Sequence, residues 1–162
     1  LGRSPTNLDQ MLVYEFTRFG PVKALGSPDD KAPPFGADRV YVEHGDWKRE
    51  AGALIDTSSA IVMAVDLTPG LRWELDRVLN DQTLRAKTLL YFPTAASFHH
   101  FSSILGQSGE ALEEPVIGRR ECVLAMHWVL GSPQFFIARR PTRLSYQVAA
   151  RLFFHQRERE VV

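Results

Sequence analysis

Two short apolar runs constrain the fold of this 162-residue chain more than any other feature. They are AIVMAV at residues 60–65 and TLLYF at residues 88–92, and neither contains a charged residue. Runs of this length without polar alternation are typical of strands that are buried on both faces of a parallel sheet. Segments with helical spacing of apolar residues precede, separate and follow them. This alternation predicts an open, mostly parallel α/β sheet with helices on both faces.

The spacing of the other apolar residues predicts the remaining elements. Helices are expected at residues 8–19, 46–58, 71–80, from Thr94 onward and from Thr142 onward. Short strands are expected at residues 22–25 and 39–43, on either side of a proline-rich loop at 27–38. Near the end, two apolar segments flank Gly131-Ser132-Pro133, which predicts a β-hairpin before the closing helix. That helix is expected to bury Leu144, Val148, Leu152 and Phe153.

A doubly wound sheet normally starts with its central strand, whereas the first element here is a helix. We therefore predict that a first strand lies upstream of Leu1, and that the place beside the strand at residues 60–65 is empty or filled from elsewhere. Residues 1–162 are expected to form a single domain. Because the chain starts with Leu, we expect that domain to be a fragment of a larger protein.

Charge and cysteine content disfavour several classes of function. Lys plus Arg and Asp plus Glu number 19 each, which gives no support to broad electrostatic binding of nucleic acid or of an anionic membrane. The basic pairs Arg119-Arg120 and Arg139-Arg140 are typical of solvated strand ends. The single cysteine, Cys122, excludes an internal disulfide and a zinc cluster built on thiolates, and it favours a cytoplasmic location. We expect Cys122 to be an inert core residue and predict no metal site.

Several other residues fit structural roles better than chemical ones. His99 and His100 diverge by roughly 100° on a helix, so one is expected to be packed and the other exposed. His127 lies within a strand and is expected to be half-buried. Ser102-Ser103 lack the Gly-x-Ser-x-Gly turn of an esterase, and the chain has neither a Gly-x-Gly-x-x-Gly motif nor a P-loop. Trp128 could contribute to a protein interface.

The octet TPGLRWEL at residues 68–75 is the strongest candidate for a functional site. It follows the strand at 60–65, and ligands of open α/β sheets bind at the carboxyl ends of the strands. Glu74 lies roughly 85° from the centre of the apolar stripe of its helix, and Trp73 lies nearly opposite that stripe. Two interpretations remain open. Glu74 forms a border salt bridge while Trp73 packs under a loop, or both residues face a ligand.

The octet also resembles a family motif. In many TIR domains the corresponding segment reads Ser-x-Trp-Cys-x-x-Glu-Leu. Here Thr68 stands at the first place and Glu74-Leu75 stand at the last two, whereas the tryptophan is displaced to Trp73 and Leu71 replaces the cysteine. Residues 46–75 therefore resemble the middle of a TIR-type domain, within the wider group that includes nucleoside deoxyribosyltransferases. The resemblance implies an open, flavodoxin-like sheet.

The resemblance also implies an activity. In catalytic TIR domains the motif glutamate acts on the ribose of NAD while the bond to nicotinamide breaks, and this would make Glu74 the catalytic residue. Ser27, Asp29 and Lys31 lie in the loop that corresponds to the one flanking the family's pocket. Together with Thr68 and Trp73, they are the ligand-binding residues that the resemblance implies. No tightly bound cofactor is expected, and NAD or a related nucleotide would be the substrate.

A second interpretation is a non-catalytic, TIR-like signalling module, such as the cytoplasmic part of a membrane protein. Its partners would be proteins or further copies of itself, with no nucleic acid, and with a membrane reached only through regions outside residues 1–162. A pocket at the ends of the strands containing Leu25 and Val65, with Glu74 pointing into it, would favour the enzyme. Pairing of Glu74 with Arg72 or Arg77 would favour the interaction module.

Overall fold

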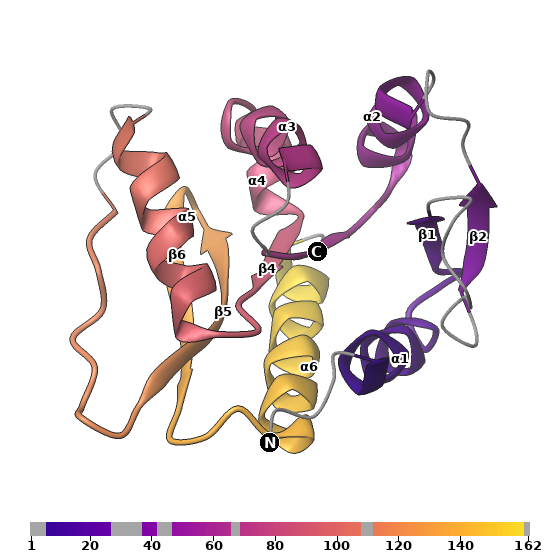
Figure 1. Ribbon diagram of the computed structural model, residues 1–162. Coiled ribbons are helices and arrows are strands. Elements are labelled where there is room, and N and C mark those ends of the chain that lie inside the picture. Colours follow the sequence, from indigo (N-terminus) through magenta and orange to yellow (C-terminus); the bar gives the residue numbers. More distant parts are fainter. Residues whose placement is uncertain (1–5, 27–36, 42–46, 66–68, 108–111, 161–162) are drawn as a thin grey trace. The chain divides into compact units, whose positions relative to one another are not determined.

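The computed structural model describes residues 6–26, 37–41, 47–65, 69–107 and 112–160 (Figure 1). They fall into two compact units. Unit 1 comprises residues 1–58 and 150–162, and unit 2 comprises residues 59–149. The last helix, α6 (Arg143–Glu160), contributes residues to both units. The described residues form both helices and strands, so the predicted α/β class is confirmed.

Unit 1 contains two helices, a pair of short strands and the second part of α6. The elements are α1 (Thr6–Phe16), β1 (Lys23–Gly26), β2 (Asp38–Tyr41) and α2 (Trp47–Thr57). The two strands pair in parallel, with Lys23 opposite Asp38 and Gly26 opposite Tyr41. The helices and strands predicted for this part of the sequence are therefore present.

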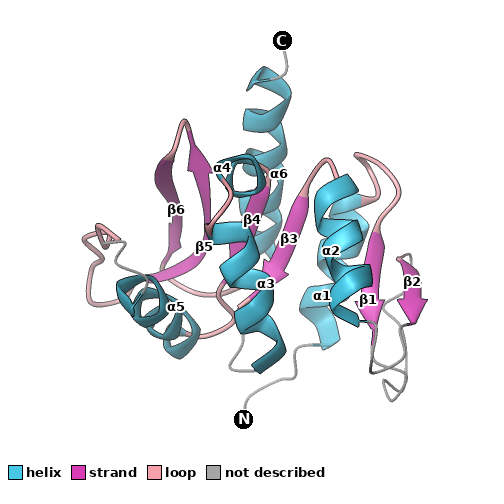
Figure 2. Ribbon diagram, turned by 90° about the horizontal axis from the view of Figure 1, so that it is seen from above, coloured by secondary structure: helices cyan, strands magenta, loops and turns pink. Residues whose placement is uncertain are grey.

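Unit 2 is built on a four-stranded sheet (Figure 2). Its elements are β3 (Ile61–Ala64), α3 (Pro69–Leu79), α4 (Gln82–Ala86), β4 (Thr88–Tyr91), α5 (Ala95–Gln107), β5 (Cys122–Val129) and β6 (Ser132–Ala138). The strand order is β3-β4-β5-β6. The pair β3–β4 is parallel, whereas β4–β5 and β5–β6 are antiparallel.

The expectation of a mostly parallel sheet is wrong for unit 2, and the connection between α5 and β5 explains why. A helix that leads directly into the next strand returns the chain so that the strand is parallel to its predecessor. Here the segment 112–118, which is neither helix nor strand, runs back along the unit after α5 (Figure 1). The chain consequently enters β5 from the opposite end, and β5 pairs antiparallel with β4.

The two parallel strands differ in how far they are buried. Every residue of β4 is buried, whereas in β3 Ile61 and Met63 are buried and Val62 and Ala64 are half-buried. Full burial on both faces is thus confirmed for β4 only. The reason is position, because β3 is an edge strand of this sheet. Within the described part of unit 2, no strand pairs with its other edge, and the origin of a neighbouring strand stays a prediction.

The predicted hairpin is present, but its turn is shorter than expected. Leu130 and Gly131 alone connect β5 to β6, and their φ angles are 49° and 83°. Two consecutive positive φ values are the signature of a type I′ turn, whose twist matches that of the flanking strands. Pro133 lies within β6, opposite Trp128. Because β6 is an edge strand, a residue that cannot donate a backbone hydrogen bond is tolerated there.

The apolar stripe of α3 is buried as expected, whereas of the four α6 residues expected to be buried only Phe153 is buried. Leu144, Val148 and Leu152 are exposed. The buried residues of α6 are Tyr146, Ala149, Ala150 and Phe153. Spacing of Leu and Val is a poor guide here because two adjacent alanines allow the helix to approach its neighbours closely. A tyrosine also covers a larger area than a leucine.

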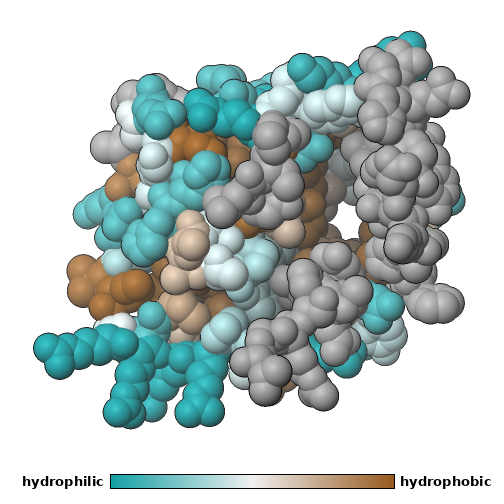
Figure 3. All heavy atoms as spheres, viewed as in Figure 1, coloured by the Kyte–Doolittle hydropathy of each residue, from teal (hydrophilic) through white to brown (hydrophobic). Residues whose placement is uncertain are grey.

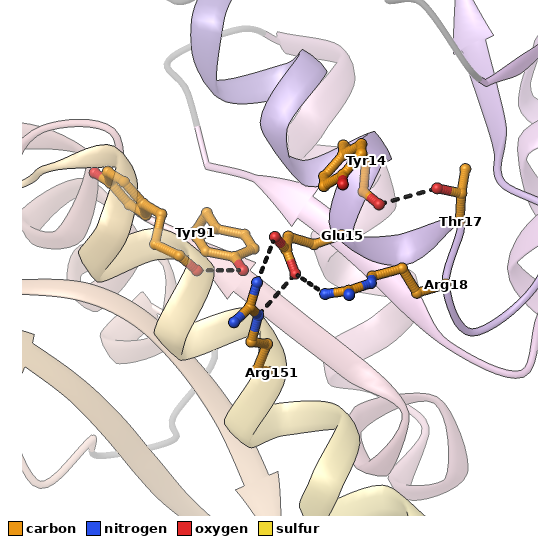
Figure 4. Close-up of polar contacts among 7 residues, drawn as sticks. Tyr14, Glu15, Thr17, Arg18, Tyr91 and Arg151 are labelled. Atoms are coloured by element: carbon orange, nitrogen blue, oxygen red, sulfur yellow. Dashed lines mark hydrogen bonds and ion pairs between the residues drawn. The ribbon is translucent and has the colours of Figure 1, made fainter.

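Tyr91 and Tyr146 fix the start of α6 to β4 within unit 2. The Tyr91 hydroxyl donates a hydrogen bond to the backbone carbonyl of Tyr146 at 3.4 Å (Figure 4). The Tyr146 hydroxyl donates in turn to the carbonyl of Phe92 at 3.0 Å. Burial raises the pKa of Tyr146 to about 12, so its phenol remains a proton donor at neutral pH.

Candidate functional site

The parallel pair of unit 2 brings two helix starts to the same edge of the sheet. Parallel strands end at the same side, and the backbone N–H of Val65 donates to the carbonyl of Tyr91 at 2.7 Å, just beyond β3. Along the chain, α3 begins at Pro69, four positions after Val65, and α5 begins at Ala95, four positions after Tyr91. Ligands of open α/β sheets are bound at such an edge.

Thr94 shapes the start of α5 at that edge. Its hydroxyl accepts a hydrogen bond from the backbone N–H of Ser97 at 3.1 Å and lies 2.9 Å from the Ser97 hydroxyl. Thr94 therefore caps α5, in line with the helix expected from this residue onward. Sequence spacing alone did not place this cap near the octet. The signal that places it there is the parallel pairing of β3 with β4, because both helices start after strands that end together.

Glu74 and Trp73 occupy the outer border of α3. Leu71, Leu75 and Val78 are buried, whereas Trp73 and Glu74 are half-buried. This burial agrees with the border position that helical geometry gives Glu74, and it places Trp73 closer to the packed side than expected. Glu74 is therefore neither a core residue nor a fully solvated one. Half-burial leaves part of each side chain accessible to a ligand.

The helix start differs from the predicted one in a way that matters for Glu74. Because α3 begins at Pro69 rather than Leu71, its first turn contains no acidic residue, and Glu74 lies in the second turn. The axial distance from Pro69 to Glu74 is about 7.5 Å at the usual rise per residue. The macrodipole acts mainly within the first turn, so it stabilises an ionised Glu74 only weakly.

Arg72 is engaged with residues other than the octet's glutamate. Its Nε lies 3.4 Å from Oδ1 of Asp76, one turn further along α3, and its Nη1 donates to Oε1 of Gln107 at 3.5 Å. The second contact connects α3 to the end of α5. These contacts orient the Arg72 side chain along the outer side of α3.

The remaining residues of the predicted binding site lie outside the described ranges. This applies to Ser27, Asp29 and Lys31 in the proline-rich loop and to Thr68 at the start of the octet. Of the predicted site, the structure therefore describes Glu74 and Trp73. The grouping of all six residues stays a prediction.

The burial of the other candidate residues differs from what the sequence predicted. His99 and His100 are both exposed, so the expectation that one is packed is wrong. Cys122 is half-buried rather than in the core, and its Sγ lies 3.4 Å from the carbonyl oxygen of Ala138. Burial raises the pKa of the Cys122 thiol and keeps it protonated. Trp128 is buried, which does not fit a role at an interface.

His127 is more deeply buried than expected. Only 2% of its surface is exposed, and its ring stacks on Phe136 with centroids 5.3 Å apart. Burial lowers the pKa of His127 to about 4, so the imidazole is neutral at pH 7.

Within the ranges that the structure covers, no group of three or more His, Cys, Asp or Glu residues could hold a metal ion. In the same ranges no helix is long and apolar enough to cross a bilayer.

A buried carboxylate in unit 1 was not identified from the sequence. Glu15 of α1 is fully buried and accepts hydrogen bonds from Nε and Nη2 of Arg151 on α6, at 2.9 and 3.0 Å (Figure 4). Arg18 lies 3.6 Å from the same carboxylate. The hydrogen bonds from Arg151 hold the pKa of Glu15 below its ordinary value, although burial acts in the opposite direction. This bidentate pair fixes α6 to α1.

Comparisons of the chain with protein families, with curated protein sequences and with solved structures find no match.

Proposed function

We propose that this protein is a nucleotide-binding domain of the TIR-like type that cleaves the N-glycosidic bond of NAD, with Glu74 as its essential carboxylate. The fold described above is of the mixed α/β class. The proposal adds that its sheet is of the open, flavodoxin-like type. It also includes Ser27, Asp29, Lys31, Thr68 and Trp73 as residues that contact the nucleotide.

One observation carries the proposal. A half-buried glutamate lies on the helix that follows an edge strand of a parallel pair, at the side where two helices start. The Cα–Cβ bond of a helical residue tilts toward the helix N-terminus. The Glu74 carboxylate can therefore reach back toward the end of β3, where a ligand of this fold class would lie.

The chemistry of the bond suits a single carboxylate. Cleavage of an N-glycosidic bond develops positive charge on the ribose, and a carboxylate near the ring stabilises that charge or binds the ribose hydroxyls. Trp73 precedes Glu74 on α3, roughly 100° away around the helix, and is also half-buried, and its indole could stack on a base or on nicotinamide. This division of roles assigns chemistry to Glu74 and binding to Trp73.

Nicotinamide release from NAD tests the proposal. The full chain is incubated with NAD over a range of protein concentrations, beside Glu74→Gln and the control Asp76→Asn, which changes another carboxylate of α3. We expect release by the wild type and by Asp76→Asn, and a loss of at least ~100-fold in Glu74→Gln. Circular dichroism establishes that each variant is folded. Absence of release by the wild type at every concentration would exclude the enzyme, and undiminished release by Glu74→Gln would exclude Glu74 as its essential carboxylate.

A second candidate function is a non-catalytic interaction module. The observation that favours it is the exposure of Leu144 and Val148, which lie one turn apart on α6 and are 68% and 46% exposed. Neighbouring exposed apolar residues are typical of protein contact surfaces. Sedimentation velocity at increasing concentration should then show self-association that Leu144→Ser abolishes. A wild-type protein that stays monomeric, and that releases nicotinamide, would exclude this alternative.

A further inference from the structure

The turn that leads into β5 presents two arginines at its tip. The backbone N–H of Glu121 donates to the carbonyl of Gly118 at 3.0 Å, which closes a turn with Arg119 and Arg120 at its two central positions. The Glu121 carboxylate stabilises the turn by accepting a hydrogen bond from the Gly118 N–H at 2.9 Å. Both arginines are exposed.

The pairing of β5 with β6 brings a second arginine pair to this turn. Cys122, the first residue of β5, lies opposite Ala138, the last residue of β6. Beyond this pair, Glu121 and then Arg120 follow on one side, and Arg139 and then Arg140 on the other, so the two arginine pairs lie at the same end of the hairpin. Figure 1 shows the segment that enters β5 and the connection from β6 to α6 at the same end of unit 2.

A fifth arginine follows at the start of α6. The Ser145 hydroxyl donates to the carbonyl of Arg140 at 3.0 Å, and the Thr142 hydroxyl caps the helix by accepting from the Ser145 N–H at 3.2 Å. These contacts hold Arg140 and Arg143 close to the first turn of α6. We call the five residues the arginine end of the hairpin. They are Arg119, Arg120, Arg139, Arg140 and Arg143.

The charges of the arginine end are available to an outside ligand. All five side chains belong to exposed residues, and none forms an ion pair with another residue that the structure describes. Residues 112–143, which include all five arginines, contain three glutamates, and the carboxylate of one of them, Glu121, is hydrogen-bonded within its own turn. Arginines thus outnumber acidic residues locally, although the whole chain is electrically balanced.

Exposed aliphatic residues adjoin this charge. Val116 is 100% exposed and Ile117 is 41% exposed, three and two positions before Arg119. In the space-filling view, apolar surface lies beside projecting hydrophilic side chains at the lower left (Figure 3). Aliphatic side chains that protrude next to arginines are typical of surfaces that enter the boundary between lipid headgroups and acyl chains. Nucleic acid binding would be better served by exposed aromatic side chains that stack on bases.

We propose that the arginine end, together with Val116 and Ile117, binds the surface of bilayers that contain anionic phospholipids. The guanidinium groups contact lipid phosphates and the two aliphatic side chains insert below them. This proposal is independent of Glu74 and of any activity toward NAD. It differs from the expectation that a membrane is reached only through regions outside residues 1–162.

Vesicle co-sedimentation tests the proposal with the full chain. Vesicles of phosphatidylcholine alone are compared with vesicles that also contain phosphatidylserine, each at low and high salt. We expect binding to the anionic vesicles only, and weaker binding at high salt. Each arginine near an anionic surface contributes a factor of about five, so Arg119→Gln/Arg120→Gln should lower the partition coefficient about 30-fold. Arg139→Gln/Arg140→Gln should lower it similarly.

Two controls separate the arginine end from charge in general and from loss of fold. Lys48→Gln/Arg49→Gln removes an exposed basic pair from α2 and should change binding less than twofold. Val116→Ser should weaken binding several-fold without changing its salt dependence, because no charge is removed. All substituted residues are exposed, and circular dichroism checks that each variant is folded.

Three outcomes would overturn the proposal. These are no binding to anionic vesicles, an equal loss in Lys48→Gln/Arg49→Gln, and binding to a single-stranded oligonucleotide without binding to vesicles. The last result would assign the arginine end to nucleic acid instead.

Discussion

Replacement of His127 by phenylalanine should make unit 2 less sensitive to acid. His127 lies on β5 opposite Leu89 and Gln134, in a buried position stacked on Phe136. Its pKa is lowered by burial from 6.5 to about 4 in the folded protein. In the unfolded chain the imidazole is solvated and takes up a proton near its ordinary pKa. The unfolded state therefore binds more protons than the folded state between these two pH values.

The sign and size of the effect follow from this difference. A histidine whose folded pKa is depressed contributes stability that is complete above its unfolded pKa and is lost as the pH falls toward its folded pKa. With a folded pKa of about 4, the loss is about 2 kcal/mol at pH 5 and approaches about 3 kcal/mol below pH 4. Almost none of it is lost at pH 7.5.

Urea unfolding at pH 7.5 and pH 5 measures the effect. A Trp47→Phe background confines the tryptophan signal to Trp73 and Trp128, both in unit 2. Phenylalanine is apolar, similar in size to histidine, and can keep the stack on Phe136. The free energy of unfolding of His127→Phe, minus that of the parent, should rise by about 2 kcal/mol between pH 7.5 and pH 5. Taking this difference cancels the titration of groups common to both proteins.

The matched control is His100→Gln, which removes an exposed imidazole in place of a buried one. If His127→Phe loses stability between pH 7.5 and pH 5 to the same extent as its parent, the reasoning is refuted. That result would mean that the buried imidazole gains no proton when the chain unfolds.

Two further predictions concern the hairpin turn and the buried carboxylate. Leu130→Asn should stabilise the protein by about 1 kcal/mol in urea unfolding, because Leu130 is 94% exposed and has φ 49°, a conformation that Asn adopts more readily than Leu. A loss of stability would contradict the I′ assignment. Glu15→Gln should destabilise unit 1 by about 2 kcal/mol at pH 7, measured by Trp47 fluorescence, since Arg151 and Arg18 lose a buried anion. The exposed Glu158→Gln should be nearly neutral. The pKa of Glu15 is lowered, so the difference from wild type should shrink below pH 4.5, and a difference that persists undiminished in acid would argue against the ion pair.

The sequence predicted those features that depend on neighbouring residues. Apolar residues spaced three or four positions apart predicted the buried face of α3, and an uninterrupted apolar run predicted the buried strand β4. The short helix α4 was missed because its five residues carry no clear period. Its signal is Asp81, whose carboxylate accepts hydrogen bonds from the N–H groups of Thr83 and Leu84.

Features that depend on distant partners were not predictable in this way. Glu15 and Arg151 are 136 positions apart, and neither has a local pattern that points to the other. A glutamate on an amphipathic helix is normally assigned to the exposed face, and only the docking of α6 makes its burial favourable. The direction of β5 was missed for a related reason, since it depends on the path of the extended segment 112–118.

The two arginine pairs show how local structure changes the meaning of a charge pattern. Each pair alone is typical of a solvated strand end, and the balanced net charge argues against binding to an anionic surface. Both inferences treat the pairs as independent. The pairing of Cys122 with Ala138 makes them neighbours, and like charges held close together repel one another unless an anion lies between them. The arginines of this exposed end form no ion pairs with acidic residues that the structure describes. Their electrostatic energy is therefore higher in the isolated protein than in a complex with an anionic surface.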